Sequence, residues 1–181
     1  MYYLFFLFLF FTIANGRFVI SLVNDVHLDL KYDPTVNSKS QCQVNMTKDP
    51  TLALYGRYGC DSPFILFKAT LEKMVAVNPS PNIVMVPGDI VSHTIPRLDG
   101  RFDDFYYNEL KLTIANYTAT IASYFPDVPI IFTQGNDDYG INYQVPDKTH
   151  RDDYYGFVYN KTIREIRANN ISVRHRVIVG Y

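Results

Sequence analysis

FVISLVNDVH, residues 18–27, joins a short apolar run to a polar end. Two later segments repeat this design: IVMVPGD, residues 83–89, and IIFTQGNDD, residues 130–138. Short apolar runs bounded by turn residues are typical of buried strands. We therefore predict three strands, each with polar side chains at its carboxyl end, over residues 17–23, 83–86 and 128–133.

Apolar residues at helical spacing separate these strands. Ser62 and Pro63 predict a helix start, with Ser62 as the N-cap and Pro63 at the first helical position, and the helix runs to about Val77. Further elements are predicted as helices over 102–124 and 151–170, a strand over 172–179, and a long loop over 29–59. Strands that alternate with helices predict right-handed β-α-β units and a largely parallel sheet, so the expected fold class is α/β.

The polar ends of the three strands have the composition of a metal centre. In parallel sheets, ligands bind outside the carboxyl ends of the strands, where Asp25, His27, Asp89 and Asn136 should converge. Two divalent metals need a bridging carboxylate and a mixed oxygen and nitrogen shell. Asp89 follows a glycine and can approach closely enough to bridge, and this ligand mixture suits zinc, iron or manganese. Each motif alone is common by chance, because a Gly-Asp after a strand is most often a turn; the set in order on three strands favours a site.

Bulk composition limits the possible classes of protein. The chain has 181 residues, 48% of them hydrophobic, which fits one compact domain. Its formal net charge is −1, with both signs interspersed. Neither a nucleic-acid footprint nor a polybasic membrane surface is indicated.

The first sixteen residues predict export. Residues 2–14 are almost continuously apolar but too short to span a bilayer, and small residues precede a cleavage after Gly16. We expect a signal peptide over 1–16, a domain over 17–181 and no transmembrane segment after cleavage; an apolar first strand or a membrane anchor is the alternative. Glycosylation sequons occur at Asn45, Asn116, Asn160 and Asn170. The two cysteines, Cys42 and Cys60, predict one disulfide in a secreted or lumenal protein, with two free buried thiols as the alternative.

These motifs together resemble a known family. Asp25-x-His27, Gly88-Asp89 and Gly135-Asn136 look like the first three signature blocks of calcineurin-like metallophosphoesterases. Residues 55–63 (YGRYGCDSP) and 88–93 (GDIVSH) are closest to the acid sphingomyelinase-like phosphodiesterase branch. The resemblance implies a four-layer α-β-β-α sandwich and a centre of two divalent metals of the zinc type. It also implies hydrolysis of phosphodiester or phosphomonoester bonds in a small-molecule or lipid substrate by metal-activated water.

The sequence departs from the family pattern at two points. Asp137 stands where the family often has a proton-donating histidine. A carboxylate serves as a proton donor only if its pKa is raised. Of the two catalytic candidates, Asp137 and His93, His93 is therefore the better proton donor. The alternative for His93 is a loop histidine that only forms hydrogen bonds. The family also completes its metal shells from a Gly-His-x-His block, and no Gly-His occurs in this chain. The two other histidines match no ligand block: His150 lies at a helix start, and His175 lies in a predicted strand. We therefore expect the chain to be the N-terminal half of the fold, truncated, with under-coordinated metals.

Three functions compete on these grounds. The first is a secreted metal-dependent phosphodiesterase, which the Asp25, His27, Asp89 and Asn136 set favours. The second is a non-catalytic secreted glycoprotein with a degenerate metal site, which Asp137 and the missing histidines favour. The third is a secreted glycoprotein that binds no metal. Metal titration separates the third from the first two, and turnover of a phosphodiester separates the first from the second.

Overall fold

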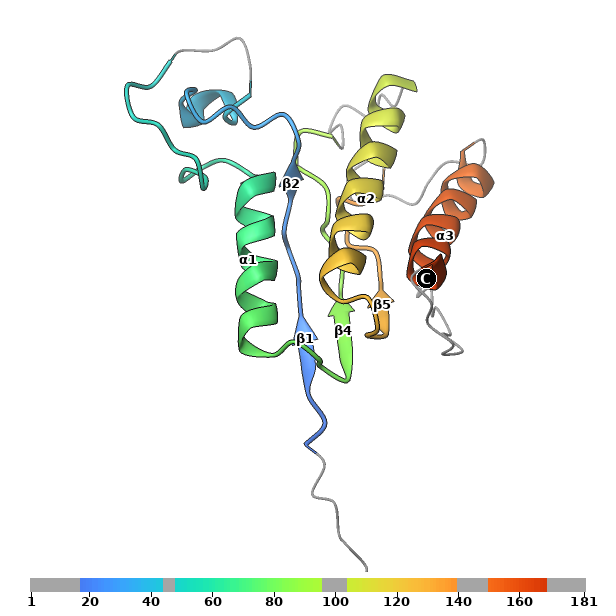
Figure 1. Ribbon diagram of the computed structural model, residues 1–181. Coiled ribbons are helices and arrows are strands. Elements are labelled where there is room, and N and C mark those ends of the chain that lie inside the picture. The colour runs from blue at the N-terminus through green and yellow to red at the C-terminus, as the bar shows by residue number, and fades with distance from the viewer. Residues whose placement is uncertain (1–16, 44–47, 96–103, 140–149, 169–181) are drawn as a thin grey trace, which may run out of the picture.

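The computed structural model describes residues 17–43, 48–95, 104–139 and 150–168 (Figure 1). The predicted signal peptide, the predicted strand over 172–179 with His175, and the sequons at Asn45 and Asn170 lie outside these residues. The elements in chain order are β1 (Ile20–Leu22), β2 (Leu28–Asp29), the 3-10 helix η1 (Ser38–Ser40), β3 (Ser62–Pro63), α1 (Phe64–Val77), β4 (Ile83–Val86), α2 (Asp104–Tyr124), β5 (Ile130–Phe132) and α3 (Arg151–Ala168).

The predicted α/β fold class is confirmed. β1, β4 and β5 form a parallel sheet in the order β1-β4-β5, with Ser21 opposite Val84 and Val84 opposite Ile130. α1 connects β1 to β4, and α2 connects β4 to β5, as expected for successive β-α-β units. A second, two-stranded parallel sheet joins β2 to β3. The structure is consistent with part of a metallophosphoesterase fold.

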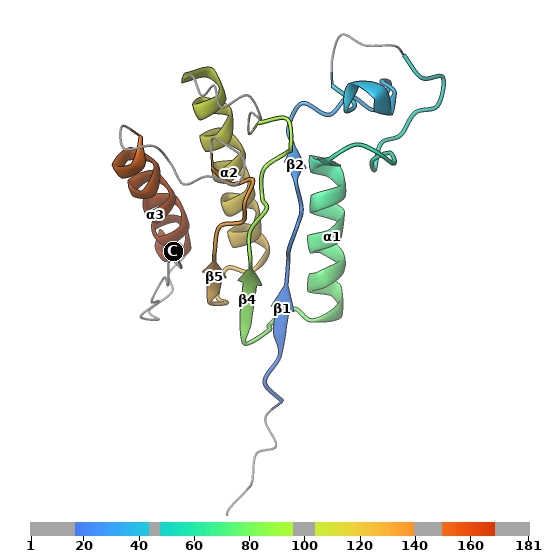
Figure 2. The same cartoon turned by 180° about the vertical axis from the view of Figure 1, so that it is seen from behind.

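One face of the main sheet carries the core. Seen from behind, β4 and β5 lie in front of α2, so this helix covers their far face, while β1 lies between β4 and α1 (Figure 2). The buried strand residues Val84, Val86, Ile130 and Phe132 share one core cluster with the predicted helical stripe of α2, namely Leu110, Ile114, Tyr117 and Ile121. Helical periodicity in residues 102–124 therefore identified the packed side of α2 correctly.

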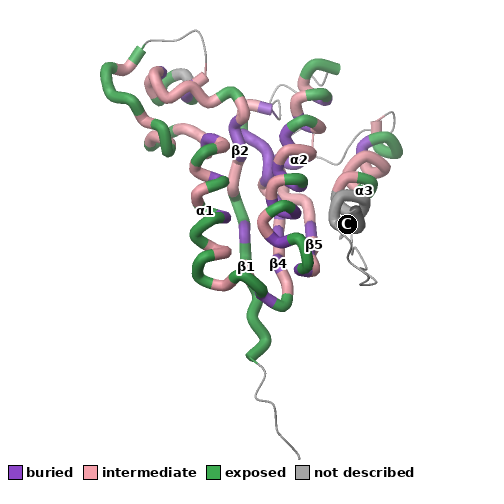
Figure 3. Tube along the Cα trace, in the orientation of Figure 1, coloured by how far each residue is buried: buried purple, intermediate pink, exposed green. Residues whose placement is uncertain are grey.

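The other face is more open than predicted. The strand over 17–23 was expected to be buried, but Ile20 is 49% and Leu22 60% exposed (Figure 3). Ile83, Met85 and Ile131 share that face by register and are only half-buried. The segment over 17–23 carries apolar side chains on both faces and was therefore predicted to be buried on both. The described residues cover only one of these faces. The open apolar face is consistent with the expected four-layer arrangement, in which a second sheet would cover it.

The predicted start of α1 was wrong by one residue. Ser62 does not cap the helix; its N–H donates to the His27 carbonyl (3.1 Å), and Ser62 pairs with Leu28. Pro63 occupies the N-cap position in an extended conformation, and the helix begins at Phe64 without a side-chain cap. Pairing of β3 with β2 thus outweighs the local capping preference and places the start of α1 beside β2 (Figure 1).

The long loop over 29–59 is confirmed as largely irregular, and a disulfide between Cys42 and Cys60 tethers it. The predicted disulfide is therefore present in the structure. Among the described residues, none of the helices combines the length and the apolar composition that crossing a bilayer requires.

Candidate metal centre

The polar residues predicted from the three strand ends meet at one edge of the sheet. Beyond the strands, the backbone pairing of β1 with β4 continues into the loops: the Asp25 N–H donates to the Gly88 carbonyl (3.3 Å), and the His27 N–H donates to the Asp89 carbonyl (3.0 Å). These bonds bring the segment after β1 beside the segment after β4. The convergence expected from the strand pattern is therefore observed.

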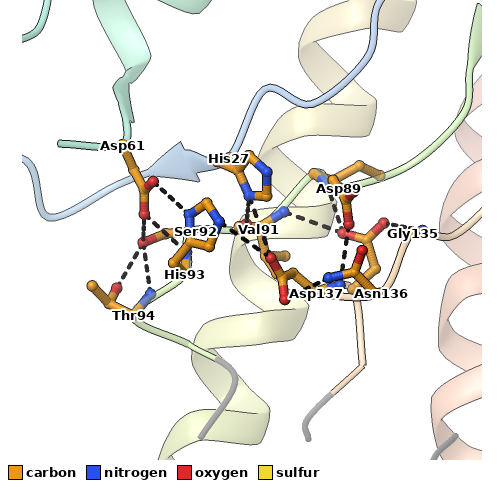
Figure 4. A network of polar contacts seen from close by, with 12 residues as sticks. His27, Asp61, Asp89, Val91, Ser92, His93, Thr94, Gly135, Asn136 and Asp137 are labelled. Atoms are coloured by element: carbon orange, nitrogen blue, oxygen red, sulfur yellow. Dashed lines mark hydrogen bonds and ion pairs between the residues drawn. The ribbon is translucent and has the colours of Figure 1, made fainter. Parts of the chain in front are cut away.

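Asp25, His27 and Asp89 form a group that could hold a metal ion. One ligand atom from each lies within 4.8 Å of the other two. Asn136 follows β5 next to this group, since the neighbouring Asp137 N–H donates to Asp89 Oδ1 (3.1 Å) (Figure 4). Two carboxylates, an imidazole and an amide oxygen are a donor set suited to a zinc-type ion.

His27 is oriented for such a role. Its Nδ1 lies 3.0 Å from the Val91 carbonyl, to which it donates in the tautomer that this contact selects. The Nε2 lone pair is then left for a metal. A ligating histidine whose second ring nitrogen is held by a carbonyl is the usual arrangement in metal sites.

Backbone conformation marks the same three residues. Asp25, His27 and Asp89 have φ angles of 52°, 43° and 52°, in the left-handed region that side chains other than glycine rarely adopt. Each such conformation costs on the order of 1–3 kcal/mol and persists where surrounding structure enforces it, commonly at functional sites. Among the described residues, Gln41 and Cys42 share this conformation in the loop over 29–59, so the backbone supports a site only together with the ligand chemistry of Asp25, His27 and Asp89.

Two glycines allow the close approach of the loops after β4 and β5. A Cβ on Gly88 would lie 2.1 Å from the Gly135 nitrogen, and a Cβ on Gly135 would lie 2.2 Å from Asp89 Oδ1. Gly88 also has a φ of +128°. The prediction that glycine lets Asp89 approach closely therefore has a structural basis, because backbone atoms occupy the space that either side chain would need.

His93 and Asp137 lie beside the metal group. The His93 ring stacks on His27 with centroids 3.9 Å apart, and its Nε2 is 3.4 Å from Asp137 Oδ2. The Asp137 side chain is 3% exposed and also accepts a bond from Asn136 Nδ2 (3.0 Å). His27, His93 and Asp137 form a second group of metal-ligand type. The His27 nitrogen facing Asp137 is Nδ1, at 3.8 Å, which already donates to Val91, so the group with Asp25 and Asp89 fits a metal better.

The sequence reasoning missed two carboxylates that support this site. Asp138 is fully buried and accepts from the N–H groups of Ile90 (2.7 Å), Val91 (3.2 Å) and Gly135 (2.9 Å). Burial raises the pKa of Asp138, while the backbone hydrogen bonds oppose that shift. Asp61 lies against His93, with Oδ1 2.8 Å from the ring Nδ1. The run of three polar residues after Gly135 and the Cys-Asp-Ser-Pro motif were the only signals of their importance.

Comparison with known proteins identifies relatives of this chain. No family model matches it. It is 28% identical over 123 residues to sphingomyelinase phosphodiesterase D and 29% identical over 132 residues to sphingomyelinase phosphodiesterase C, both of Dictyostelium discoideum. It is 26% identical over 131 residues to acid sphingomyelinase-like phosphodiesterase 3b of Mus musculus. The chain is a distant homologue of these phosphodiesterases.

This homology confirms the resemblance inferred from the motifs. The alignments cover 68–71% of the chain but only 25–27% of the length of these three relatives. The roles assigned to Asp25, His27, Asp89, Asn136, His93 and Asp137 stay predictions, although the structure gathers all six at one sheet edge.

Proposed function

We propose that this chain forms part of a secreted, metal-dependent phosphoesterase that hydrolyses phosphodiester or phosphomonoester bonds. The observation that carries the proposal is the Asp25, His27 and Asp89 group, whose ligand atoms lie within 4.8 Å of one another in a homologue of phosphodiesterases. Because the chain spans about a quarter of those relatives, the substrate of a whole protein, whether a small molecule or a lipid, belongs to the proposal as well.

Asp25, His27, Asp89 and Asn136 would hold two divalent ions, zinc in the first instance, with iron or manganese as alternatives. Such ions would supply Lewis-acid stabilisation of a phosphoryl group and lower the pKa of a water molecule. The fit rests on the donor chemistry of these residues, on the His27 tautomer selected by Val91, and on the left-handed backbone at three of the four positions.

His93 in its imidazolium form would deliver a proton to the leaving-group oxygen from Nε2, while its Nδ1–H stays hydrogen-bonded to Asp61. Its ring is 53% exposed at the side of the metal group, so a substrate can reach it. Asp137, the second catalytic candidate, is buried against Nε2 and would hold that nitrogen toward the site. This division of roles agrees with the geometry, because the Asp137 side chain is only 3% exposed and its Oδ2 lies 3.4 Å from Nε2, whereas His93 is open to a substrate.

Secretion is part of the same proposal. The disulfide between Cys42 and Cys60 supports it, because disulfides persist in oxidising compartments and are rare in the cytosol. The apolar residues 2–14 and the sequons support it from the sequence. Secretion of an epitope-tagged chain, with N-terminal sequencing of the product, tests it; an intracellular product that retains residues 1–16 would contradict it.

Calorimetric zinc titration and hydrolysis of bis(p-nitrophenyl) phosphate test the catalytic proposal. Asp89→Asn keeps the size of the side chain but removes the charge that a bridging ligand needs, so we expect it to weaken zinc binding by at least about tenfold and to abolish turnover. Asp33→Asn is the matched control, since Asp33 is a loop carboxylate bonded to Thr35 away from the site. Zinc binding that Asp89→Asn leaves unchanged would remove Asp89 from the centre.

A non-catalytic secreted glycoprotein with a degenerate metal site is the second candidate. Asp137 favours it, because that residue replaces the histidine that the family resemblance implies. The two candidates differ in one measurement: both bind zinc through Asp89, but only the phosphoesterase turns over the chromogenic diester. A chain that binds no zinc would contradict both.

A further inference from the structure

A chain of hydrogen bonds connects the disulfide-tethered loop to His93. Cys42 is fully buried and forms a disulfide with Cys60. Gln43 follows Cys42 and Asp61 follows Cys60, and these two residues are the ends of the series of hydrogen bonds. Gln43 Nε2 donates to Thr94 Oγ1 (2.9 Å), and the hydroxyls of Thr94 and Ser92 lie 2.7 Å apart. Ser92 Oγ then donates to Asp61 Oδ2 (2.8 Å). Because Gln43 Nε2 can only donate and the Asp61 carboxylate only accept, the Thr94 hydroxyl donates to Ser92 and the Ser92 hydroxyl donates to Asp61.

Asp61 holds His93 at two points. Its Oδ2 accepts from the His93 backbone N–H (2.8 Å), and its Oδ1 lies 2.8 Å from the ring Nδ1 (Figure 4). The Asp61 side chain is 15% exposed, whereas that of His93 is 53% exposed. Asp61, the less exposed of the two, therefore fixes the orientation of His93. In Figure 4 the His93 ring lies between Asp61 and Asp137, so that fixing Nδ1 on Asp61 directs Nε2 toward Asp137 and the metal group.

We propose that Asp61 is a positioning residue that keeps the His93 ring with hydrogen on Nδ1 and Nε2 toward the metal group, and that the Cys42–Cys60 disulfide holds Asp61 in place for this task. The catalytic meaning of this arrangement rests on the proposed function, whereas the tautomer and the orientation of the ring do not. A neutral imidazole carries one N–H, and the hydrogen-bond partner of one nitrogen decides which nitrogen is left as the acceptor.

Asp61→Asn should reverse the tautomer. Two donors, the His93 N–H and the Ser92 hydroxyl, meet at Oδ2, so the amide oxygen of asparagine will take that position. Its NH2 group then faces Nδ1, which must become an acceptor, and the ring hydrogen moves to Nε2. An Asp-to-Asn change that leaves geometry intact but imposes the wrong histidine tautomer is a known way to impair a catalytic histidine.

Long-range proton–nitrogen NMR of 15N-histidine-labelled chain, at a pH where the rings are neutral, tests the proposal. His93 is assigned by loss of its signals in His93→Gln. We expect a protonated Nδ1 in the unaltered chain and in the Asp33→Asn control, and a protonated Nε2 in Asp61→Asn. A protonated Nε2 in the unaltered chain, or no change in Asp61→Asn, would overturn the role of Asp61.

Reduction of the Cys42–Cys60 disulfide, followed by the same NMR measurement of His93, tests whether the disulfide holds Asp61 in place. We expect the His93 nitrogen shifts to move toward those of free histidine, while far-ultraviolet circular dichroism still reports helices. Unchanged His93 shifts after complete reduction would overturn the role of the disulfide. Where the chain turns over a diester, Asp61→Asn should lower kcat about 10- to 100-fold with little change in KM, because the NH2 group that faces Nδ1 cannot accept from the Nδ1–H of the protonated ring. A reversed tautomer in a chain without turnover would contradict the proposed function and leave the positioning role standing.

Discussion

Replacing Gly135 by alanine adds one methyl group between the loops that carry Asp89 and Asn136. The new Cβ would lie 2.2 Å from Asp89 Oδ1 and 2.5 Å from both Asp89 Cγ and the Asp89 backbone nitrogen, although real Cβ atoms essentially never approach closer than 3.0 Å. The carboxylate can rotate away, but the backbone nitrogen cannot. The loops after β4 and β5 must therefore separate by at least about 0.5 Å, and the Asp89 carboxylate must move by at least about 0.8 Å, to bring these contacts up to the 3.0 Å limit.

These displacements are large compared with what a metal centre tolerates. Ligand distances are kept within about 0.2 Å, so the displaced carboxylate should weaken zinc binding at least about tenfold. The movement also strains two bonds across the loops, from Asp137 N–H to Asp89 Oδ1 (3.1 Å) and from Ile90 N–H to Asp138 Oδ1 (2.7 Å). Overpacking of a tight site costs about 1–3 kcal/mol of unfolding free energy.

Urea unfolding with and without zinc measures both effects, because a ligand that binds only the folded state raises its stability. Gly156→Ala is the matched control: a Cβ there meets no atom of the described residues within 4 Å, and Gly156 lies within α3. That variant should gain about 0.5–1 kcal/mol, since glycine inside a helix is unfavourable. A Gly135→Ala chain with unchanged stability and unchanged zinc dependence would refute the close-approach argument.

Substitutions at three other positions test further features of the molecule. Asp138→Asn should cost about 1–3 kcal/mol in urea unfolding, because its NH2 group must face a backbone N–H that the carboxylate now accepts. Asp25→Gly and Asp25→Ala should both lose zinc affinity in calorimetry, but the glycine variant should be more stable by about 1 kcal/mol because φ there is 52°; equal stabilities would contradict strain at this position. Hydrogen bonds from Lys111 and Tyr107 lower the pKa of Asp153, so its contribution is present above the unfolded pKa and lost as pH falls through the folded pKa. Asp153→Asn should flatten the acid limb of a stability-against-pH curve, and an unchanged limb would show that this contact between α2 and α3 contributes nothing.

Much of the main sheet could be predicted because the patterns that identify its strands and helices lie within short segments of the sequence. The apolar runs before Asp25, Asp89 and Asn136 are continuous, and the helices between them show a clear period, so strand order and direction follow from the handedness of β-α-β units. The exposure of Ile20 and Leu22 could not be predicted in the same way. A run that is apolar on both faces gives the same pattern whether one or both faces are covered by the residues described.

The supporting residues escaped prediction for a different reason. Asp25, His27 and Asp89 are recognisable because each stands a fixed few residues after a strand, whereas Asp61 contacts His93 across 32 positions and Asp138 contacts Ile90 across 48. Such pairs leave no period in the sequence, and a buried aspartate that accepts backbone N–H groups has the same letter as an aspartate in an exposed turn. The predicted ligands can therefore be recognised from their positions after the strands. Their orientation depends on Asp61 and Asp138, whose hydrogen-bond partners become neighbours only in the folded chain. Substituting those carboxylates separates the two contributions, because the predicted ligands stay in the sequence while their orientation is lost.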